Sequence, residues 1–402
     1  MEIKISPSVA SGEIKAPPSK SYAHRYLIAS SLSRSGKISN VSFSNDILAT
    51  YQCLKALGFN INKEGSVVSI KGQKDINKEI ILDCLESGST LRFLIPICLL
   101  FDKKITLKGS KKLFSRGLDI YLDIFKEQNI EYILNEDSLT IKGKLKPGKF
   151  KFRGDISSQF ITGLLFVLPL LDGFSHIELT SKLESSSYVA ITLHVLARYG
   201  IQIDKLGKHF YILGNQNYRE DLEVEVEGDY SNASFLEALN LLGGNVLIKG
   251  LNPKSKQGDK AYLKYFPLLK KTSPIIDLSN CIDLGPILFT VASIFNGATF
   301  KNINRLRIKE SDRVIDMIKP LSLYGLDYRL SDNEIVINPI KDLKPLNKTI
   351  NPVNDHRVVM SLIILLTKVG GNISNIEAIN KSYPDFLNTL EELGIGVTYV
   401  SR

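Results

Sequence analysis

The stretch NRLRIKESDR, Asn304 to Arg313, joins a strand-like segment to a helix-like one. Four of its ten side chains are cationic, and Glu310 and Asp312 lie among them. Apolar residues follow at helical spacing, and Asp312 or the serine before it would cap the helix. Cations in a loop that opens a helix favour an anion site, and a carboxylate among them stays ionised and can move a proton. Taken alone, the stretch also fits a solvated loop whose charges cancel.

The composition is that of an ordinary globular protein. The 402 residues suffice for two or three domains with large cores, and 44% of them are hydrophobic and 23% charged. The formal net charge of +9 suits anionic partners, which are either phosphorylated metabolites or nucleic acid. Charge alone does not choose between these two classes of partner.

The cysteines and the apolar runs indicate the cellular compartment in which the protein works. Cys53, Cys84, Cys98 and Cys281 show no CxxC spacing, which argues against a zinc site and fits a reducing cytosol. The N-terminal residues carry no signal-peptide or transit-peptide pattern, and the longest apolar runs are too short to span a bilayer. The sequence therefore predicts a cytoplasmic protein with no membrane partner.

Six short polar turns recur along the chain, and an apolar helix-like run follows each of them. Successive turns lie roughly 50 to 75 residues apart, and one sixth of the chain is about 67 residues. A period of this size predicts repeated supersecondary units. The turns contain, in order, Ser21, Ser89, Ser157, Ser231, Asp283 and Asp355.

A second amphipathic helix is expected in each repeat, and a strand hairpin follows most of these helices. The helices are expected at 46–57, 118–128, 189–199, 262–270, 314–323 and 385–393. Each repeat thus reads as strand, helix, strand, helix and hairpin. Six such repeats predict a mixed α/β protein of two domains with three repeats each, divided near 226–228.

The turns also collect side chains that suit anions. Lys20, Ser21 and Arg25 open the first helix, Gly88 permits close backbone approach, and Arg92 is embedded in an apolar helix. Structural alternatives exist for each position: a capped helix start, a surface arginine at 116, and an ion pair for Arg92. For Ser157, Ser158 and Asp283 the alternative is helix capping.

Motifs of other chemistries are missing from the sequence. There is no Walker A loop, no GxGxxG and no GxSxG nucleophile elbow, so His356 beside Asp355 carries little weight as a hydrolase dyad. No dense carboxylate cluster suggests a metal. The sequence predicts one or two anionic small molecules as ligands and proton transfer with neither a metal nor a cofactor.

In this combination and order, the motifs resemble those of the 5-enolpyruvylshikimate-3-phosphate synthases (3-phosphoshikimate 1-carboxyvinyltransferases) of the enolpyruvyl transferase family. The resemblance runs from PPSKSYAHR near the start to KSYPDF near the end. It includes SGSTLR, SRGL, SSQF, GDYSNASF, RIKESDR and DHR, of which RIKESDR and SSQF are the most specific. Single motifs are weak, and their joint occurrence carries the resemblance.

The resemblance implies two similar domains, each an inside-out α/β barrel of three βαβαββ units. Residues 17–226 would form one domain, and residues 1–16 with 227–402 the other. Ligands would bind in the cleft between the domains, which would close over them. The implied reaction, part of the shikimate pathway of aromatic amino acid biosynthesis, joins phosphoenolpyruvate to the 5-hydroxyl of shikimate 3-phosphate and releases inorganic phosphate. It needs no cofactor, metal or nucleic acid, and a monomer is expected.

The resemblance also assigns residues to roles. Asp283 would take the hydroxyl proton, Glu310 would serve the enol carbon, and Lys20 would act beside them. Shikimate 3-phosphate would contact Lys20, Ser21, Arg25, Ser157, Ser158, Gln159, Ser181, Tyr188, Asp283 and Lys309. Phosphoenolpyruvate would contact Lys20, Gly88, Arg116, Gln159, Arg313, Arg357 and Lys381.

Four positions depart from the usual family pattern: Glu86, Phe93, Ala190 and Arg305. They put substrate affinity in question more than the reaction, because Glu86 and Phe93 lie near Gly88 and Arg92.

Two rival functions share part of this pattern. The sister enzymes that use UDP-N-acetylglucosamine usually have Lys-Asn where this chain has Lys20-Ser21, and a reactive cysteine in a Gly-rich loop. A nucleic-acid-binding protein would interleave basic residues with exposed aromatics, whereas the arginines here stand at helix starts.

Overall fold

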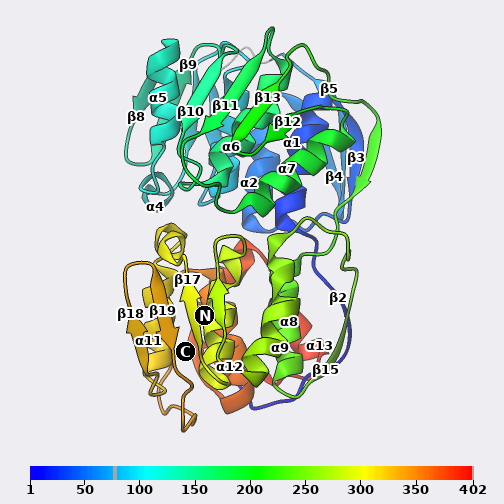
Figure 1. The fold of residues 1–402 in the computed structure, drawn as a ribbon. Coiled ribbons are helices and arrows are strands. Elements are labelled where there is room, and N and C mark those ends of the chain that lie inside the picture. Colours follow the sequence, from blue (N-terminus) through cyan, green and yellow to red (C-terminus); the bar gives the residue numbers. More distant parts are fainter. Residues whose placement is uncertain (76–78, 401–402) are drawn as a thin grey trace. The chain divides into compact units, whose positions relative to one another are not determined.

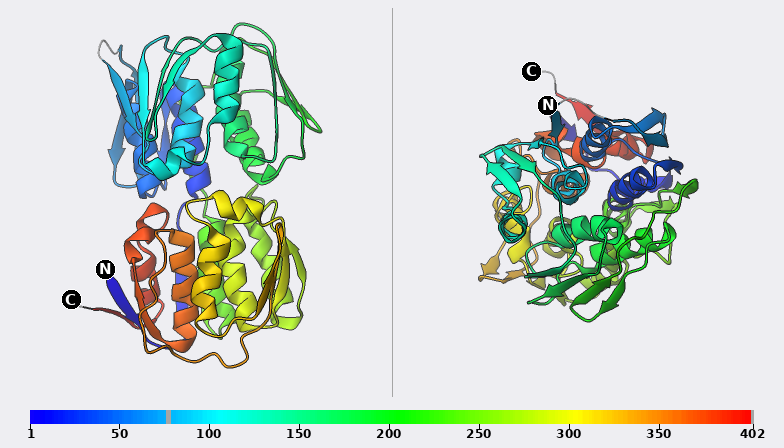
Figure 2. Two further views of the ribbon diagram at one scale, coloured as in Figure 1. Left: turned by 90° about the vertical axis from the view of Figure 1, so that its left-hand side faces the viewer. Right: turned by 90° about the horizontal axis from the view of Figure 1, so that it is seen from above.

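The computed structural model describes residues 1–75 and 79–400, which group into two compact units. One unit holds Pro18–Glu227, and the other combines Met1–Pro17 with Gly228–Arg402. Both are mixed α/β. Within each unit the central helices are buried and small sheets lie outside them (Figures 1 and 2).

Three buried helices form the centre of the Pro18–Glu227 unit: α1 (Lys20–Ser33), α3 (Gly88–Cys98) and α6 (Ser158–Val167). Apolar residues surround α6 on all sides, which is the pattern of a helix in the core. The second helix of each repeat is α2 (Asn45–Ala56), α5 (Asp119–Gln128) or α7 (Ser186–Arg198), and the short α4 (Lys111–Phe114) and η1 (Leu168–Leu170) link elements.

Three four-stranded sheets cover these helices, and each has the same design. Two parallel strands are followed by an antiparallel hairpin, in the orders β14-β3-β5-β4, β6-β7-β9-β8 and β10-β11-β13-β12. The strands are β3 (Ser35–Ser39), β4 (Phe59–Glu64), β5 (Val67–Gln73), β6 (Ile80–Asp83), β7 (Ile105–Lys108), β8 (Glu131–Leu134), β9 (Ser138–Lys142), β10 (Lys149–Phe152), β11 (Ser175–Leu179), β12 (Asp204–Leu206), β13 (His209–Ile212) and β14 (Leu222–Glu225).

The other unit is built in the same way around α8 (Tyr230–Leu241), α10 (Gly285–Ile294) and α12 (His356–Val369). Its second helices are α9 (Tyr262–Lys271), α11 (Arg313–Ser322) and α13 (Phe386–Glu392), and its short helices are η2 (Gly258–Ala261), η3 (Ile282–Leu284), η4 (Asn304–Ile308) and η5 (Ile376–Lys381). One sheet has the order β16-β17-β19-β18, from β16 (Ile275–Asp277), β17 (Ala298–Lys301), β18 (Tyr328–Leu330) and β19 (Glu334–Ile337).

The N-terminal segment supplies two strands to this unit. In the sheet β20-β1-β21, β1 (Glu2–Ile5) lies antiparallel between β20 (Gly371–Ser374) and β21 (Val397–Tyr399), the place that a hairpin strand takes elsewhere. The second strand, β2 (Ser11–Lys15), runs parallel to β15 (Asn245–Lys249).

The expectation that every repeat ends in a hairpin is wrong for the repeat of α8 and α9. Its sheet contains only β2 and β15 among the described residues. The chain passes from Lys271 through three residues to β16, which leaves no length for two more strands. The short spacing of about 50 residues between Ser231 and Asp283 has this cause.

The predicted helix after the RIKESDR stretch is confirmed as α11. The side chain of Asp312 caps it by accepting a hydrogen bond of 3.1 Å from the Ile315 amide. Val314, Met317 and Leu321 are fully buried on one face, as their spacing predicts.

Within the described ranges, no helix combines the length and apolar character needed to cross a membrane.

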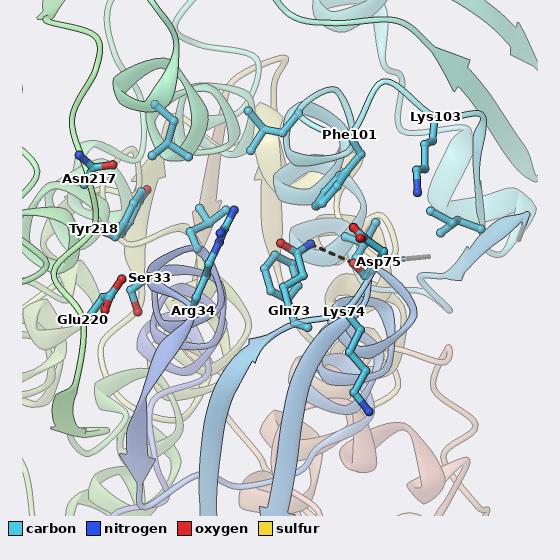
Figure 3. A pocket seen from close by; sticks show the side chains of 16 residues that line it. Ser33, Arg34, Gln73, Lys74, Asp75, Phe101, Lys103, Asn217, Tyr218 and Glu220 are labelled. Carbon is cyan, nitrogen blue, oxygen red and sulfur yellow. Dashed lines mark hydrogen bonds between the residues drawn. The ribbon is translucent and has the colours of Figure 1, made fainter. Parts of the chain in front are cut away.

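A pocket of about 720 Å³ lies in the Pro18–Glu227 unit at the C-terminal end of α1 (Figure 3). Ser33, Arg34 and Gln73 line it together with Phe101 and Tyr218. Lys20 begins the same helix at its other end, about 20 Å away at 1.5 Å per residue. None of the described residues expected in the site lines this pocket.

Candidate active site

Lys20 is the first residue of α1, and its ammonium lies 2.7 Å from the Oδ2 atom of Asp46 on α2. Both side chains are mostly buried, with 19% and 16% of their surfaces exposed. Asp46 was not expected in the site. It holds Lys20 in one position and offsets its charge, which an anionic ligand would otherwise meet in full.

The guanidinium of Arg25 is buried one turn further along α1. Its Nη1 donates to the Ser21 carbonyl at 2.7 Å, and its Nη2 donates to the Tyr188 carbonyl at 3.1 Å. The Phe93 ring lies 5.2 Å from the guanidinium carbon, so this departure from the family pattern packs against a predicted ligand residue. Burial lowers the pKa of Arg25 to about 10, which leaves it cationic at neutral pH.

Gly88 begins α3 beneath two arginines. A Cβ atom built on Gly88 would lie 3.0 Å from Nη1 of Arg116 and 3.1 Å from Nη1 of Arg92. Arg92 Nη2 donates to the Arg116 carbonyl at 3.2 Å, and Nη1 donates to Oε1 of Gln159 at 3.0 Å. The glycine therefore leaves room for both guanidinium groups at one helix N-terminus.

Ser157, Ser158 and Gln159 open α6. The Ser157 hydroxyl accepts from the Gln159 amide at 3.3 Å, so the capping role considered for this serine is confirmed. Ser158 is buried. The Gln159 side chain donates to the Ser89 hydroxyl at 3.1 Å and accepts from Arg92, so it ties α6 to α3.

Ser181 precedes the turn that leads into α7, and Tyr188 lies in the first turn of that helix. The Ser181 hydroxyl donates to Asp155 Oδ1 at 2.8 Å and accepts from the Gly154 amide at 2.9 Å, which fixes the loop that leads to Ser157. Asp155 is another carboxylate that the sequence did not bring forward. Its hydrogen bond with Arg153 lowers its pKa to about 2.

Hydrogen-bonded hydroxyls hold the helices behind these side chains. His24 Nδ1 lies 2.8 Å from the Thr50 hydroxyl, which lies 2.7 Å from that of Thr90, so α1, α2 and α3 are joined. Thr192 accepts from Arg25 Nε at 2.8 Å and pairs with Thr162 at 2.8 Å. Burial, with Lys20 and Arg25 nearby, keeps the pKa of His24 well below its usual value and the ring neutral.

The second cluster lies in the other unit and centres on Arg313, whose side chain is 1% exposed. Its Nη1 donates to Asp283 Oδ1 at 2.7 Å, and its Nη2 donates to Glu310 Oε2 at 2.6 Å. Its Nε donates to Asp355 Oδ2 at 2.8 Å. Burial opposes the charge of Arg313, but Asp355, Glu310 and Asp283 outweigh burial and raise its pKa well above normal.

Three further cations lie around these acids. Lys309 Nζ is 3.3 Å and Arg357 Nε 3.6 Å from Asp283 Oδ1. Lys381 donates to the Asn354 carbonyl at 2.8 Å, beside Asp355. Burial lowers the pKa of Lys309 to about 8, although Asp283 and Glu310 act in the opposite direction.

The structure thus gathers the expected residues into one cluster per unit. Asp283 lies in η3, and its Oδ1 atom binds the cations of Arg313, Lys309 and Arg357. The sequence brings Asp355 forward only as part of a turn and as the neighbour of His356, yet in the structure it caps α12 and binds Arg313. Asp46, Asp155 and Asp355 share one feature: each is an acid that positions a predicted ligand residue.

These features define a class of protein: an α/β protein of repeated units that places cations at helix N-termini and keeps carboxylates among them. Such groups suit the binding of multiply charged anions and proton transfer between them.

Comparison with known proteins narrows the class. Residues 6–390 match the family described as EPSP synthase (3-phosphoshikimate 1-carboxyvinyltransferase), and the chain belongs to this family. A relative named 3-phosphoshikimate 1-carboxyvinyltransferase from Clostridium kluyveri is 40% identical over 416 residues, which cover 98% of this chain and 97% of the relative. A protein of the same name from Clostridium novyi is 41% identical over 425 residues, with the same coverage.

A solved structure of EPSP synthase from Acinetobacter baumannii has the same fold. It superposes with a TM-score of 0.79 at 19% identity and covers 99% of this chain and 100% of its own. The expected fold class, two similar α/β domains built from repeats, is therefore confirmed.

Proposed function

We propose that this chain transfers the enolpyruvyl group of phosphoenolpyruvate to the 5-hydroxyl of shikimate 3-phosphate and releases inorganic phosphate, as a step of the shikimate pathway. Its family and its relatives' names support this reaction. The observation that carries the proposal is the fork of Arg313, which holds the carboxylates of Asp283 and Glu310 on its two terminal nitrogens. The reaction needs two such proton-carrying groups.

Asp283 accepts the proton of the 5-hydroxyl as its oxygen bonds to the central carbon of phosphoenolpyruvate. Glu310 donates a proton to the methylene carbon, which becomes a methyl group in a tetrahedral intermediate. Phosphate then leaves with the electrons of its C–O bond and takes up the proton held by Asp283, and the methyl group returns one proton to Glu310. The enol ether forms with atoms and charges balanced.

Cations are required because both substrates are polyanions that repel each other. We assign Lys309 and the residues of the α1, α6 and α7 starts to shikimate 3-phosphate: Lys20, Ser21, Arg25, Ser157, Ser158, Gln159, Ser181 and Tyr188. We assign Gly88, Arg116, Arg357 and Lys381, with Lys20, Gln159 and Arg313, to phosphoenolpyruvate. Arg313 already donates to three carboxylates, so the chief part we give it is to hold Asp283 and Glu310.

Phosphate release from phosphoenolpyruvate tests the proposal. The purified protein is assayed with shikimate 3-phosphate, with UDP-N-acetylglucosamine and with neither acceptor, each with and without a chelator. Release that requires shikimate 3-phosphate and survives the chelator is expected. Release only with the sugar nucleotide would overturn the proposed acceptor. If the folded protein releases no phosphate with either acceptor, or releases it equally well without one, the proposed reaction is wrong.

We further propose that the enzyme works as a monomer in the cytoplasm. Sedimentation at the assay concentration tests the oligomeric state, and a dimer would contradict it.

A further inference from the structure

A buried carboxyl group that has no role in the proposed reaction lies beside the Asp283 cluster. Asp259 belongs to η2, which contacts both η3, the element that carries Asp283, and α8. Only 5% of its surface is exposed. Aspartate is almost never buried to this degree without a partner, because desolvation penalises its charge.

The Asp259 carboxyl is not fully satisfied. Its Oδ1 atom and the hydroxyl of Ser231 on α8 are both buried without a partner at hydrogen-bonding distance in the described ranges, and the nearby Ser231 hydroxyl offsets the burial of Asp259 only in part. A buried polar atom without a partner loses its hydration and gains no bond in return, so such groups call for a functional or structural reason.

The backbone around Asp259 is held firmly. The Gln257 side chain donates to the Gly228 carbonyl at 2.8 Å and accepts from the Tyr230 amide at 3.0 Å. Gln257 thereby ties the start of η2 to the N-terminus of α8. Because this frame is fixed, the position of the Asp259 carboxyl is not an accident of a loose loop.

The charged and titratable groups that face Asp259 come from each neighbouring element. They are Asp283 in η3, the Cys281 thiol just before η3, Arg357 on α12 and Asp229 at the start of α8. Burial, followed by the charge of Asp283, raises the pKa of Asp259 to about 7, while Arg357 acts in the opposite direction. The carboxyl therefore changes its charge near neutral pH, unlike an ordinary aspartate.

We propose that Asp259 is a positioning residue whose buried carboxyl sets the charge behind Asp283 and Arg357 and so tunes proton uptake by Asp283. Arg313, Lys309 and Arg357 surround Asp283, and positive charge opposes protonation of a carboxylate. When Asp259 loses its proton to solvent, the added negative charge favours transfer of the hydroxyl proton to Asp283. This inference rests on the proposed function.

The first test is the pH profile of kcat/KM for shikimate 3-phosphate in wild type and in Asp259→Asn. The variant is expected to equal wild type within about twofold at pH 6 and to fall about three- to tenfold below it at pH 8, since one pKa unit of coupling is a factor of ten. Titration of the substrate phosphates affects both proteins equally. Glu237→Gln, which changes a half-buried acid on the neighbouring helix α8, is the matched control and should keep the wild-type profile.

The second test does not depend on activity. In the folded protein Asp259 holds its proton up to about pH 7, whereas the unfolded chain releases it near 3.8. Wild-type stability therefore falls as pH rises through this interval, because the native state binds more protons than the unfolded state. Asn has no such proton, so the Tm of Asp259→Asn relative to wild type should rise by a few degrees between pH 5 and pH 8.

The outcomes separate the two proposals. If the Tm of Asp259→Asn rises relative to wild type with pH but the wild type releases no phosphate, the titration of Asp259 is confirmed and the proposed function is wrong. Normal release with a variant profile that overlays wild type would overturn the role of Asp259. A Tm difference that is flat with pH would overturn its titration. Asp259→Ser is made in parallel, so that the test survives if the Asn variant does not fold.

Discussion

Arg313 donates from Nη1 to Asp283 at 2.7 Å and from Nε to Asp355 at 2.8 Å, so one buried guanidinium joins the start of α10 to the start of α12. Asp355 is completely buried, and Arg313 is 1% exposed. The arrangement keeps a predicted proton carrier in place, and it also makes the fold depend on that arginine.

Replacing Arg313 by methionine should destabilise the protein by about 3–5 kcal/mol, because it leaves the buried Asp355 charge without its cation. Urea unfolding followed by circular dichroism measures this change. Lys111→Met is the control, since Lys111 and Glu136 form an exposed ion pair that is worth about 1 kcal/mol or less. Equal stability of the two variants would show that Arg313 does not support Asp355.

Gly88→Ala should raise the KM for phosphoenolpyruvate about three- to tenfold and change kcat little. The new methyl group would lie 3.0 Å from Nη1 of Arg116 and 3.1 Å from Nη1 of Arg92, so these side chains must move. Steady-state kinetics with each substrate varied in turn makes the measurement. The KM for shikimate 3-phosphate is the internal control, and a larger change there would contradict the assignment of Gly88.

Much of the fold was predictable from the sequence because it depends on local patterns. The helix at 314–323 follows from an amphipathic run and a cap, and both are present in α11. The absence of a hairpin after α9 was harder to predict. Five of the six repeats suggested a common pattern, and a single short interval between turns was the sole sign of the exception. In the structure only three residues separate α9 from β16.

The positioning acids could not be predicted, for a physical reason. Asp46 meets Lys20 across 26 positions of sequence, and Asp355 meets Arg313 across 42. No helical or strand periodicity relates residues so far apart in the sequence. An isolated Asp in a turn is therefore interpreted as a helix N-cap. Sequence patterns therefore indicate which cations gather, but the acids that hold them become visible only in three dimensions.

Binding of shikimate 3-phosphate should weaken as pH rises through about 8, because burial gives Lys309 a pKa of about 8 and the neutral amine no longer attracts phosphate. The stability of the folded protein should instead increase with pH over this range. The folded protein loses this proton before the unfolded chain does, so stability rises between about pH 8 and 10.5.

Lys309→Arg tests this prediction, since arginine stays charged throughout the range. Its KM for shikimate 3-phosphate should be nearly constant from pH 7 to 9, whereas the wild-type KM rises. Parallel profiles would mean that another group causes the change.

Glu310→Gln should lower kcat by about 10²–10⁴-fold and leave both substrates bound with near-normal affinity. The amide keeps the shape of the side chain and still has an oxygen that can accept the hydrogen bond from Arg313 Nη2, but it carries no proton for the methylene carbon. Rapid-quench measurement of a single turnover, with binding followed by calorimetry, separates the two effects. Glu334→Gln, at a partly exposed glutamate near Lys301, should keep full turnover. Wild-type turnover in Glu310→Gln would rule out proton transfer by this residue, whereas loss of binding alone would make it a ligand-positioning group.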